Sequence, residues 1–273
     1  MVELKCMIRA VKIIFIVIAV LAIVVISFNY KRFLNIGGGK NMKKVFNVVL
    51  VGAAGSGKGT QGDLIKNTMN LLQVSAGEVL RQYRSNKDAK YTKTINEYID
   101  KGQLVPSYIT HELIAEYIKK NVFCDECKYD GVIYDGFPRQ MEQLEFLDKF
   151  LGENDNKVDA VVYIDVPMDV LADRLSGRFS CSKCGTLYHK TKKPTKLAGV
   201  CDVCGSKKFN VRADDQDEDA IKSRFKIFKE TTMPVLSKYE ERNIVIKVDG
   251  TKSPKEIGDI VISKLQQIKS RKS

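Results

Sequence analysis

The segment from Val45 to Gln61 reads VFNVVLVGAAGSGKGTQ, and it decides the fold class. Its apolar run through Val51 predicts a strand that is buried on both faces. A glycine-rich turn follows and Lys58 opens a predicted helix, which gives the G-x-x-x-x-G-K pattern of a phosphate-binding loop. Glycines let successive backbone N–H groups point at one anion, and the helix N-terminus adds positive charge. One detail departs from the usual pattern, because Gly59 stands where a hydroxyl residue normally follows the lysine, and the hydroxyl comes at Thr60.

The composition indicates one sizeable domain with a basic appendage. The chain has 273 residues and a net charge of +12, which is enough for one core domain and a smaller segment. Residues 1–44 contain eight Lys and Arg against the single acid Glu3, so more than half of the net charge lies there. The modest remaining surplus suits a protein that handles polyphosphates. No basic stripe with interleaved aromatic residues occurs and Trp is absent, so we expect no nucleic-acid partner.

Residues 1–44 form a separate module because they contain one long apolar run. Residues 13–28 carry no charge, and residues 13–30 approach the minimum length for crossing a bilayer. Basic residues flank the run, and no A-x-A cleavage site follows it. We therefore expect a membrane-anchored protein whose main domain lies in a reducing, ATP-containing compartment, on the cytoplasmic side. The alternative is a targeting segment for an organelle, either the mitochondrion or the plastid.

From Val45 onward the pattern alternates between short strands and amphipathic helices. Predicted strands lie at Val132–Asp135, Ala160–Asp165 and Ile244–Val248, and predicted helices between them include Ile109–Lys120 and Met141–Leu151. This alternation predicts an α/β fold with a parallel sheet and helices on both faces. Ligands in such folds bind at the carboxyl ends of the strands.

Four of the seven cysteines form one tight pattern, Cys181-x-x-Cys184 followed by Cys201-x-x-Cys204. Two C-x-x-C pairs at this separation predict a tetrahedral zinc site of the ribbon type. Four thiolates leave no coordination position for water, so the predicted Zn²⁺ is structural. It would substitute for a core in a segment that is too small to bury one.

Six arginines lie at the ends of predicted strands or helices, namely Arg81, Arg139, Arg174, Arg178, Arg212 and Arg224. Phosphoryl transfer depends on positioning and on neutralising charge that is spread over several phosphates. The planar, permanently charged guanidinium group suits that task. Taken singly, each of these arginines is more often a solvated surface residue, so the interpretation depends on the whole group together with the phosphate loop.

Five segments together resemble adenylate kinase and its nucleoside-monophosphate-kinase relatives. They are GAAGSGKGTQ, SAGEVLR (75–81), DGFPRQ (135–140), DRLSGR (173–178) and RADDQDE (212–218), and the resemblance runs from about residue 44 to 268. It implies a P-loop kinase fold for residues 45–268, with an acceptor-binding part at 75–104 and a zinc-ribbon-like lid at 177–215. It also implies a monomer, and the lid with four cysteines is typical of the long-lid adenylate kinases.

The resemblance assigns roles by position. ATP would contact Gly55, Gly57, Lys58, Gly59, Thr60 and Arg174. AMP would contact Ala76, Arg81, Arg139 and Gln143. Lys58, Arg139, Arg178, Arg212 and Arg224 would be catalytic, and Asp135 would orient the water shell of Mg²⁺. Asp214 and Asp215 match family acids at the lid hinge, but a solvated, acidic helix start is an equal alternative.

The sequence gives conflicting indications of which base the acceptor nucleotide carries. Gln143 stands where adenylate kinases have a Gln that reads adenine, whereas Ala76 and Glu78 resemble the uridylate and cytidylate kinases. We expect AMP, because a mismatched buried polar contact costs about 1–3 kcal/mol. The alternatives are a UMP/CMP kinase, a GTP:AMP phosphotransferase, or a non-catalytic protein that binds nucleotide and zinc.

Overall fold

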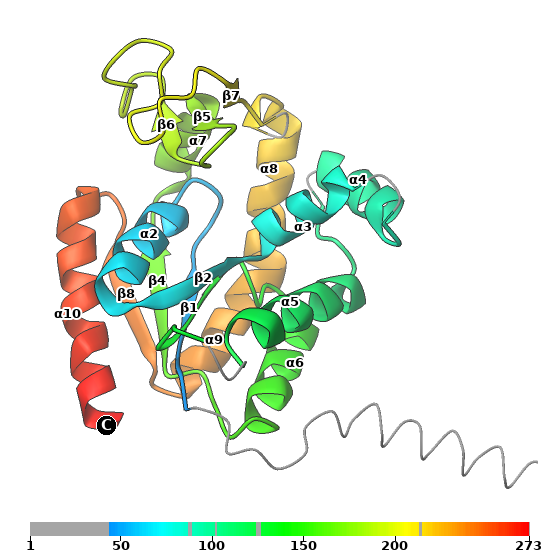
Figure 1. The fold of residues 1–273 in the computed structure, drawn as a ribbon, viewed down its shortest axis with the longest axis vertical. Helices are drawn as coiled ribbons and strands as arrows, with labels where there is room; N and C mark the ends of the chain where they lie inside the picture. The colour runs from blue at the N-terminus through cyan, green and yellow to red at the C-terminus, as the bar shows by residue number, and fades with distance from the viewer. Residues whose placement is uncertain (1–43, 87–88, 102, 124–126, 213–214, 273) are drawn as a thin grey trace, which may run out of the picture. The chain divides into compact units, whose positions relative to one another are not determined.

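The computed structural model describes residues 44–86, 89–101, 103–123, 127–212 and 215–272. Its centre is a five-stranded parallel sheet in the order β2-β3-β1-β4-β8 (Figure 1). The strands are β1 (Phe46–Val51), β2 (Leu71–Ser75), β3 (Gly131–Asp135), β4 (Ala160–Asp165) and β8 (Val245–Asp249). The predicted α/β fold with a parallel sheet is therefore confirmed.

Helices cover both faces of the sheet, as the alternating side chains of β1 require. Val49 and Val51 pack with α5 (Ser107–Asn121), α6 (Met141–Gly152) and α9 (Met233–Glu241). Val48 and Leu50 point the other way and pack with α2 (Lys58–Met69), α7 (Met168–Ser176) and α10 (Pro254–Lys272). Every residue of β1 is buried, which explains its continuous apolar sequence.

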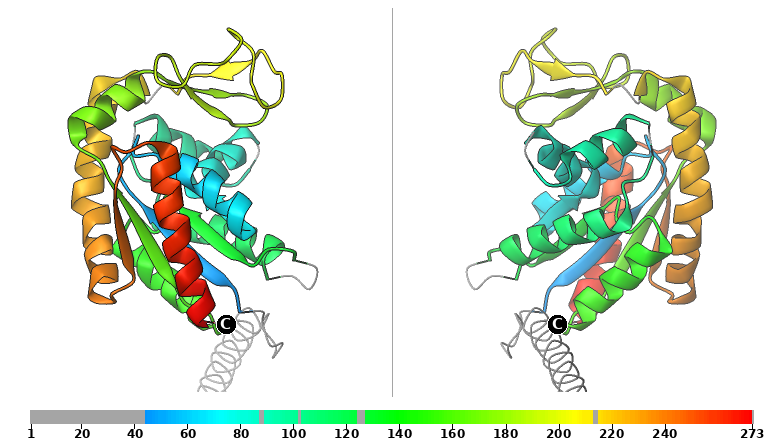
Figure 2. Two further views of the ribbon diagram at one scale, coloured as in Figure 1. Left: turned by 90° about the vertical axis from the view of Figure 1, so that its left-hand side faces the viewer. Right: turned by 90° about the vertical axis from the view of Figure 1, so that its right-hand side faces the viewer.

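Two smaller parts lie at the carboxyl ends of the strands. The helices α3 (Ala76–Ser85) and α4 (Thr92–Asp100) share a small core that includes Leu80, Ile95 and Ile109. The strands β5 (Arg178–Cys181), β6 (Leu187–His189) and β7 (Phe209–Asn210) form an antiparallel sheet, drawn in yellow-green to yellow above the end of the main sheet in Figure 2. We call residues 178–210 the lid segment. The helix α8 (Glu218–Ile227) and the π-helical turn η2 (Phe228–Thr232) lead from it to α9.

The predicted elements agree with the structure, but the prediction omits one strand of the parallel sheet and the three short strands of the lid segment. The predicted strands match β1, β3, β4 and β8 to within one residue at each end, and the two predicted helices match α5 and α6 to within two. β2 was not among the predicted strands. Of its residues LLQVS, Leu71 and Val74 are buried and the other three are partly buried, because β2 is an edge strand that carries Gln73 in the middle.

Candidate active site

The loop between β1 and α2 has the backbone shape that its glycines predict. Gly57 has φ 99°, a left-handed conformation that side chains with a Cβ rarely adopt, and it directly precedes the first residue of α2. A Cβ on Gly57 would meet no atom within 4 Å, so the backbone conformation and not crowding requires glycine there. The loop therefore presents the N-terminus of α2, with its positive end, to the cavity described below.

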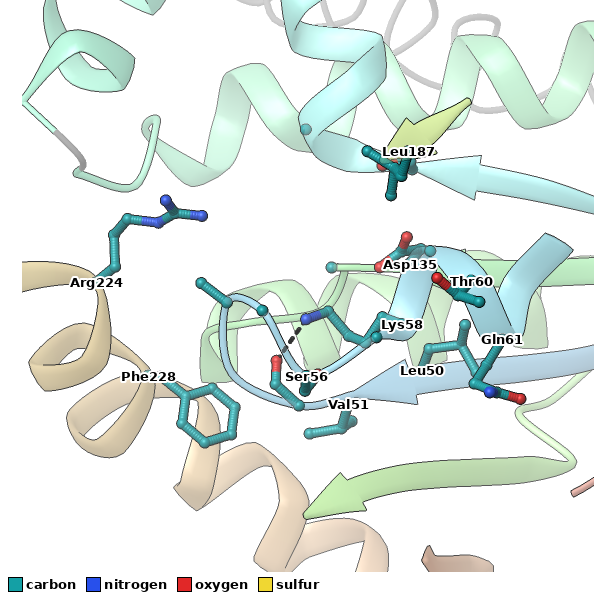
Figure 3. Close-up of a pocket in the computed structure, with 18 of the residues that line it drawn as sticks. Leu50, Val51, Ser56, Lys58, Thr60, Gln61, Asp135, Leu187, Arg224 and Phe228 are labelled. Carbon is teal, nitrogen blue, oxygen red and sulfur yellow. Dashed lines mark hydrogen bonds between the residues drawn. The ribbon is translucent and has the colours of Figure 1, made fainter. Parts of the chain in front are cut away.

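Lys58 is half-buried and turns back toward its own loop (Figure 3). Its Nζ donates hydrogen bonds to the carbonyl oxygens of Gly52 at 2.7 Å and Ala53 at 2.9 Å. Burial lowers the pKa of Lys58 to about 7, the neighbouring carboxylate of Asp135 acts in the opposite direction, and nearby arginines lower the pKa further. The lysine is therefore held by carbonyls that an anion could replace.

Arg139 lies beside Asp135 at the end of β3. The Nε of Arg139 donates to the carbonyl oxygen of Gly136 at 2.9 Å. The hydroxyl of Thr232 donates to the carbonyl oxygen of Arg139 at 3.2 Å. Burial lowers the pKa of Arg139, Asp135 raises it, and Arg224 and Arg81 lower it. These contacts fix a half-buried cation at the carboxyl edge of the sheet.

Asp215 connects the base of the lid segment to α8. Its carboxylate is fully buried and accepts hydrogen bonds from Arg178 Nε and Nη2, both at 2.7 Å, and from Arg224 Nη1 at 2.8 Å. Two arginines from different elements are therefore aligned by one carboxylate. Asp215 is not a solvated helix-start residue, and the first turn of α8 is capped instead by Asp217, whose Oδ1 accepts from Asp219 N at 2.9 Å. Asp214 lies outside the described residues.

On the acceptor side, Gln143 is almost fully buried in the first turn of α6. Its Oε1 accepts from the backbone N–H of Arg139 at 2.7 Å, and its Nε2 donates to Gln140 Oε1 at 3.3 Å. Ala76 begins α3 and is also buried, and Arg81 lies one turn further along the same helix. The acceptor-side residues therefore come from two helices that start at the ends of neighbouring strands.

All of these elements meet around one cavity of about 620 Å³. The predicted nucleotide residues line it without exception: Gly55, Gly57, Lys58, Gly59, Thr60, Ala76, Arg81, Asp135, Arg139, Gln143, Arg174, Arg178, Arg212 and Arg224. The lid segment lies close over the loop, because a Cβ on Gly59 would be 3.5 Å from Leu187 Cδ1. It also approaches α3, because a Cβ on Gly185 would be 3.8 Å from Glu78 Oε1. The structure brings the predicted residues together, and their individual roles stay predictions.

Comparison with known proteins identifies the family. A family model described as adenylate kinase matches residues 50–244. An adenylate kinase of Enterococcus faecalis is 39% identical over 222 residues, which cover 81% of this chain and 98% of that protein. An adenylate kinase of Clostridium acetobutylicum is 37% identical over 221 residues, which cover 81% of this chain and 99% of that protein. The chain belongs to the adenylate kinase family.

Membership of the adenylate kinase family makes the chain an enzyme of that kind and confirms the resemblance seen in the five sequence segments. A further adenylate kinase, from Lactococcus lactis subsp. lactis, is 39% identical over 204 residues, or 75% of this chain and 92% of that protein. The parallel sheet with its glycine-rich loop is the P-loop kinase fold that the resemblance implied.

The comparisons contradict the predicted membrane localisation. Adenylate kinases of Clostridium tetani and Clostridium acetobutylicum are matched over 94% and 99% of their length by about four fifths of this chain. Within the described ranges, no helix is both long enough and apolar enough to cross a membrane. The apolar run at residues 13–30 lies outside the described residues. The prediction of a membrane-anchored protein was therefore wrong, and we do not retain it.

The lid segment of this adenylate kinase brings the four cysteines together. The Sγ atoms of Cys181, Cys184, Cys201 and Cys204 all lie within 4.8 Å of one another. The Cys181–Cys204 and Cys184–Cys201 pairs are each 3.5 Å apart. Thiolates that bind tetrahedral zinc at 2.3 Å lie about 3.8 Å apart, so this arrangement fits the metal.

The structure adds residues to the adenylate kinase cavity that the sequence analysis did not place there. Tyr188, His189 and Lys192 line it from the lid segment. His189 Nε2 lies 3.2 Å from the carbonyl oxygen of Asp173, and Lys192 pairs with the Asp173 carboxylate, so both connect the lid segment to α7. Gln73 of the unpredicted strand β2 donates to Asp135 Oδ2 at 3.4 Å. Nothing in the local sequence marks these residues, since each depends on a contact between separate elements.

Proposed function

We propose that this cavity transfers the γ-phosphoryl group of ATP to AMP, giving two ADP, and that the reaction is reversible. The observation that carries the proposal is the convergence of a phosphate-binding loop, six arginines and Asp135 on one cavity. Phosphoryl transfer requires this kind of site, because its transition state needs in-line positioning and dispersed positive charge more than covalent assistance. No general base is assigned.

The donor triphosphate would lie against the loop and the start of α2. The backbone N–H groups of Gly55, Gly57, Gly59 and Thr60 would surround its β- and γ-phosphates. Lys58 would exchange its two carbonyl acceptors for phosphate oxygens, which would also favour its charged form. Arg174, whose Nη2 donates to the carbonyl of Gly250 at 2.9 Å, would pack on the donor base.

The acceptor nucleotide would occupy the side of the cavity formed by α3 and α6. Arg81 and Arg139 would hold its phosphate, while Ala76 and Gln143 would face its base. Gln143 retains one hydrogen on Nε2 and one lone pair on Oε1 beyond the contacts described above. An adenine edge needs that combination of donor and acceptor.

Three arginines of β5, α8 and the chain between them would complete the site during transfer. Arg178, Arg212 and Arg224 would stabilise the charge on the transferring group, with Asp215 keeping two of them aligned. The approach of the lid segment to both the loop and α3 supports a closed arrangement that excludes water. Excluding water would direct the phosphoryl group to AMP and prevent hydrolysis.

Two metal ions belong to the proposal. Mg²⁺ takes oxygen ligands and keeps several waters, and the carboxylate of Asp135 and the hydroxyl of Thr60 lie beside Lys58 (Figure 3). The ion would neutralise charge on the phosphates when bound. Zn²⁺ would hold the lid segment through its four cysteines and would take no part in the chemistry.

We also propose a division of the chain by role. Residues 45–268 would be the kinase domain, with 75–104 as the acceptor-binding part and 177–215 as the lid, and residues 1–44 would be separate. The small core around Ile95 and the separate antiparallel sheet of the lid segment support the two inner boundaries.

The test of the reaction is ADP formation from ATP and AMP by the purified full chain. Lys58→Ala should lower kcat by more than tenfold, which corresponds to about 1.4 kcal/mol of transition-state stabilisation. The matched control is Lys66→Ala, because Lys66 is on the same helix but does not line the cavity and pairs with Asp63 at the surface. A loss below tenfold for Lys58→Ala would remove the role proposed for this lysine.

The acceptor base is tested separately. We expect kcat/KM for AMP to exceed the values for CMP and UMP, because Gln143 offers a donor and an acceptor to the base. An equal or higher value for either pyrimidine nucleotide would reverse the choice of AMP.

A further inference from the structure

Gln143 is one member of a continuous series of hydrogen bonds that reaches away from the cavity. The backbone N–H of Arg139 donates to Gln143 Oε1 at 2.7 Å, and Gln143 Nε2 donates to Gln140 Oε1 at 3.3 Å. The hydroxyl of Ser107, the first residue of α5, donates to the same Gln140 Oε1 at 2.9 Å. Of the described residues, Gln143 lines the cavity while Gln140 and Ser107 do not.

The backbone N–H of Arg139 fixes which group donates in every hydrogen bond of this series. A backbone N–H can only donate, so the atom of Gln143 that faces Arg139 must be its carbonyl oxygen. The amide nitrogen of Gln143 therefore faces Gln140, and Gln140 must present its own oxygen. The hydroxyl of Ser107 then serves as the second donor to that oxygen.

The anchor of the series is itself held in place. The carbonyl of Arg139 accepts from the buried Thr232 hydroxyl at 3.2 Å, and Arg139 Nε donates to Gly136 at 2.9 Å. At the other end, α5 and α6 pack side by side, so Ser107 reaches Gln140 across 33 residues of sequence (Figure 1). The amide of Gln143 is therefore constrained from both sides.

This constraint affects base selection, because an unconstrained glutamine amide can rotate by about 180° and exchange its oxygen and nitrogen. Adenine has an amino donor at position 6, whereas a 6-oxopurine such as hypoxanthine has an acceptor there. A glutamine that can rotate its amide by half a turn can pair with either base. Only an amide of fixed polarity rejects the oxo base, since two acceptors or two donors would then face each other.

We propose that Gln140 and Ser107 are positioning residues that fix the polarity of the Gln143 amide and so make the acceptor site select adenine over 6-oxopurines. The proposal rests on the proposed function, because it takes Gln143 as the residue that reads the acceptor base. Gln140 acts through Gln143 and would not touch the nucleotide.

The test compares AMP and IMP as acceptors with saturating ATP, using the full chain and its variants. Gln140→Leu, which removes the acceptor oxygen, should reduce the ratio of kcat/KM for AMP to that for IMP by about tenfold. Most of the change should appear in KM for the monophosphate, while KM for ATP stays within about twofold. Ser107→Ala should change the ratio in the same direction by a smaller factor.

Two further variants separate positioning from a structural effect. Gln140→Glu keeps oxygen acceptors toward both Ser107 and Gln143, so it should retain the AMP preference to within about threefold. Gln267→Leu is the matched control, because Gln267 is exposed on α10 and is remote in sequence from every residue of the series. Its ratio should equal that of the unmodified chain.

Each result decides the question. If AMP and IMP lose activity by the same factor in Gln140→Leu, Gln140 is only structural and the inference is overturned. If Gln140→Leu does not fold, an unchanged ratio in Ser107→Ala overturns it equally. Failure of the proposed function is distinguishable, because the unmodified chain would then fail to prefer AMP over CMP and UMP before any variant is made.

Discussion

Asp215→Asn removes the carboxylate that accepts hydrogen bonds from two arginines of the site. Asp215 is fully buried and accepts three N–H groups from Arg178 and Arg224, whose side chains are each 17% exposed. Asparagine would place an NH₂ group against guanidinium donors and would leave two cations without their counterion. Breaking a buried ion pair by removing one partner costs about 3–5 kcal/mol. Because the arginines keep some contact with solvent, we expect the lower value of about 3 kcal/mol.

The matched control is Asp148→Asn, which breaks a pair of similar geometry at the surface. Arg242 donates to Asp148 Oδ1 at 2.9 Å and to Oδ2 at 2.6 Å, but the two side chains are 38% and 34% exposed. Exposed pairs contribute about 0.2–1 kcal/mol because water and salt screen them. Urea unfolding of both variants should therefore give free-energy losses that differ at least threefold, with a Tm decrease of roughly 6–12 °C for Asp215→Asn. Equal losses in the two variants would refute the reasoning from burial.

The same variant separates stability from positioning. At temperatures where Asp215→Asn is still fully folded, kcat should fall at least tenfold, because Arg178 and Arg224 would no longer be aligned by one carboxylate. Asp148→Asn should leave kcat within about twofold. A destabilised Asp215→Asn enzyme with unchanged kcat would show that Asp215 contributes to folding alone.

The further predictions concern the loop, Lys58 and the zinc site. Gly57→Ala should cost about 1–2 kcal/mol of stability through backbone strain alone and should raise KM for ATP. The control is Gly152→Ala, which should cost no stability, because a Cβ there also meets no atom within 4 Å and Gly152 lacks a left-handed φ. Equal losses of stability in the two variants would contradict the role of φ 99° at Gly57. Burial lowers the pKa of Lys58 to about 7, below its unfolded value, so folded stability should rise with pH from about 7 to 10 as the unfolded chain loses its extra proton. At pH 8, ATP binding should accordingly be coupled to the uptake of a proton by Lys58. Calorimetry in buffers of different ionisation enthalpy measures this uptake. An equal uptake in Lys58→Met would show that another group takes up the proton. Chelation under reducing conditions should release about one Zn²⁺ per chain and lower both Tm and kcat, and a metal-free chain with unchanged Tm would argue against a structural metal.

The parts of the fold that could be predicted are those that local sequence determines. β1 and the loop before α2 are recognisable because a buried strand, positive-φ glycines and a helix start follow one another directly. The edge at which the arginines gather could be predicted as well, since parallel strands place their carboxyl ends together. β2 was missed because it is a short edge strand in which only Leu71 and Val74 are buried and whose centre is Gln73.

The finer parts of the site could not be predicted because they depend on distant contacts. Asp215 reads as one more acid in an acidic helix start, and only its meeting with Arg178, 37 residues away, shows it to be buried. Gln140 has no distinguishing neighbour in sequence, yet it pairs with Ser107 across 33 residues. The individual roles of the arginines came from the family resemblance, because spacing alone does not separate a phosphate ligand from a surface cation.

Two carboxylates lie among the cations of the cavity. Asp135 favours the charged forms of Lys58 and Arg139, and Asp215 holds Arg178 and Arg224. The neighbouring arginines still lower the pKa of Lys58, so the carboxylates offset the mutual repulsion of the cations only in part. A polyphosphate would relieve that repulsion, and part of its binding free energy would come from cations that are already in place. Because Arg178 begins the lid segment and Asp215 follows it, one carboxylate connects the two ends of the lid segment to each other and to Arg224 of α8.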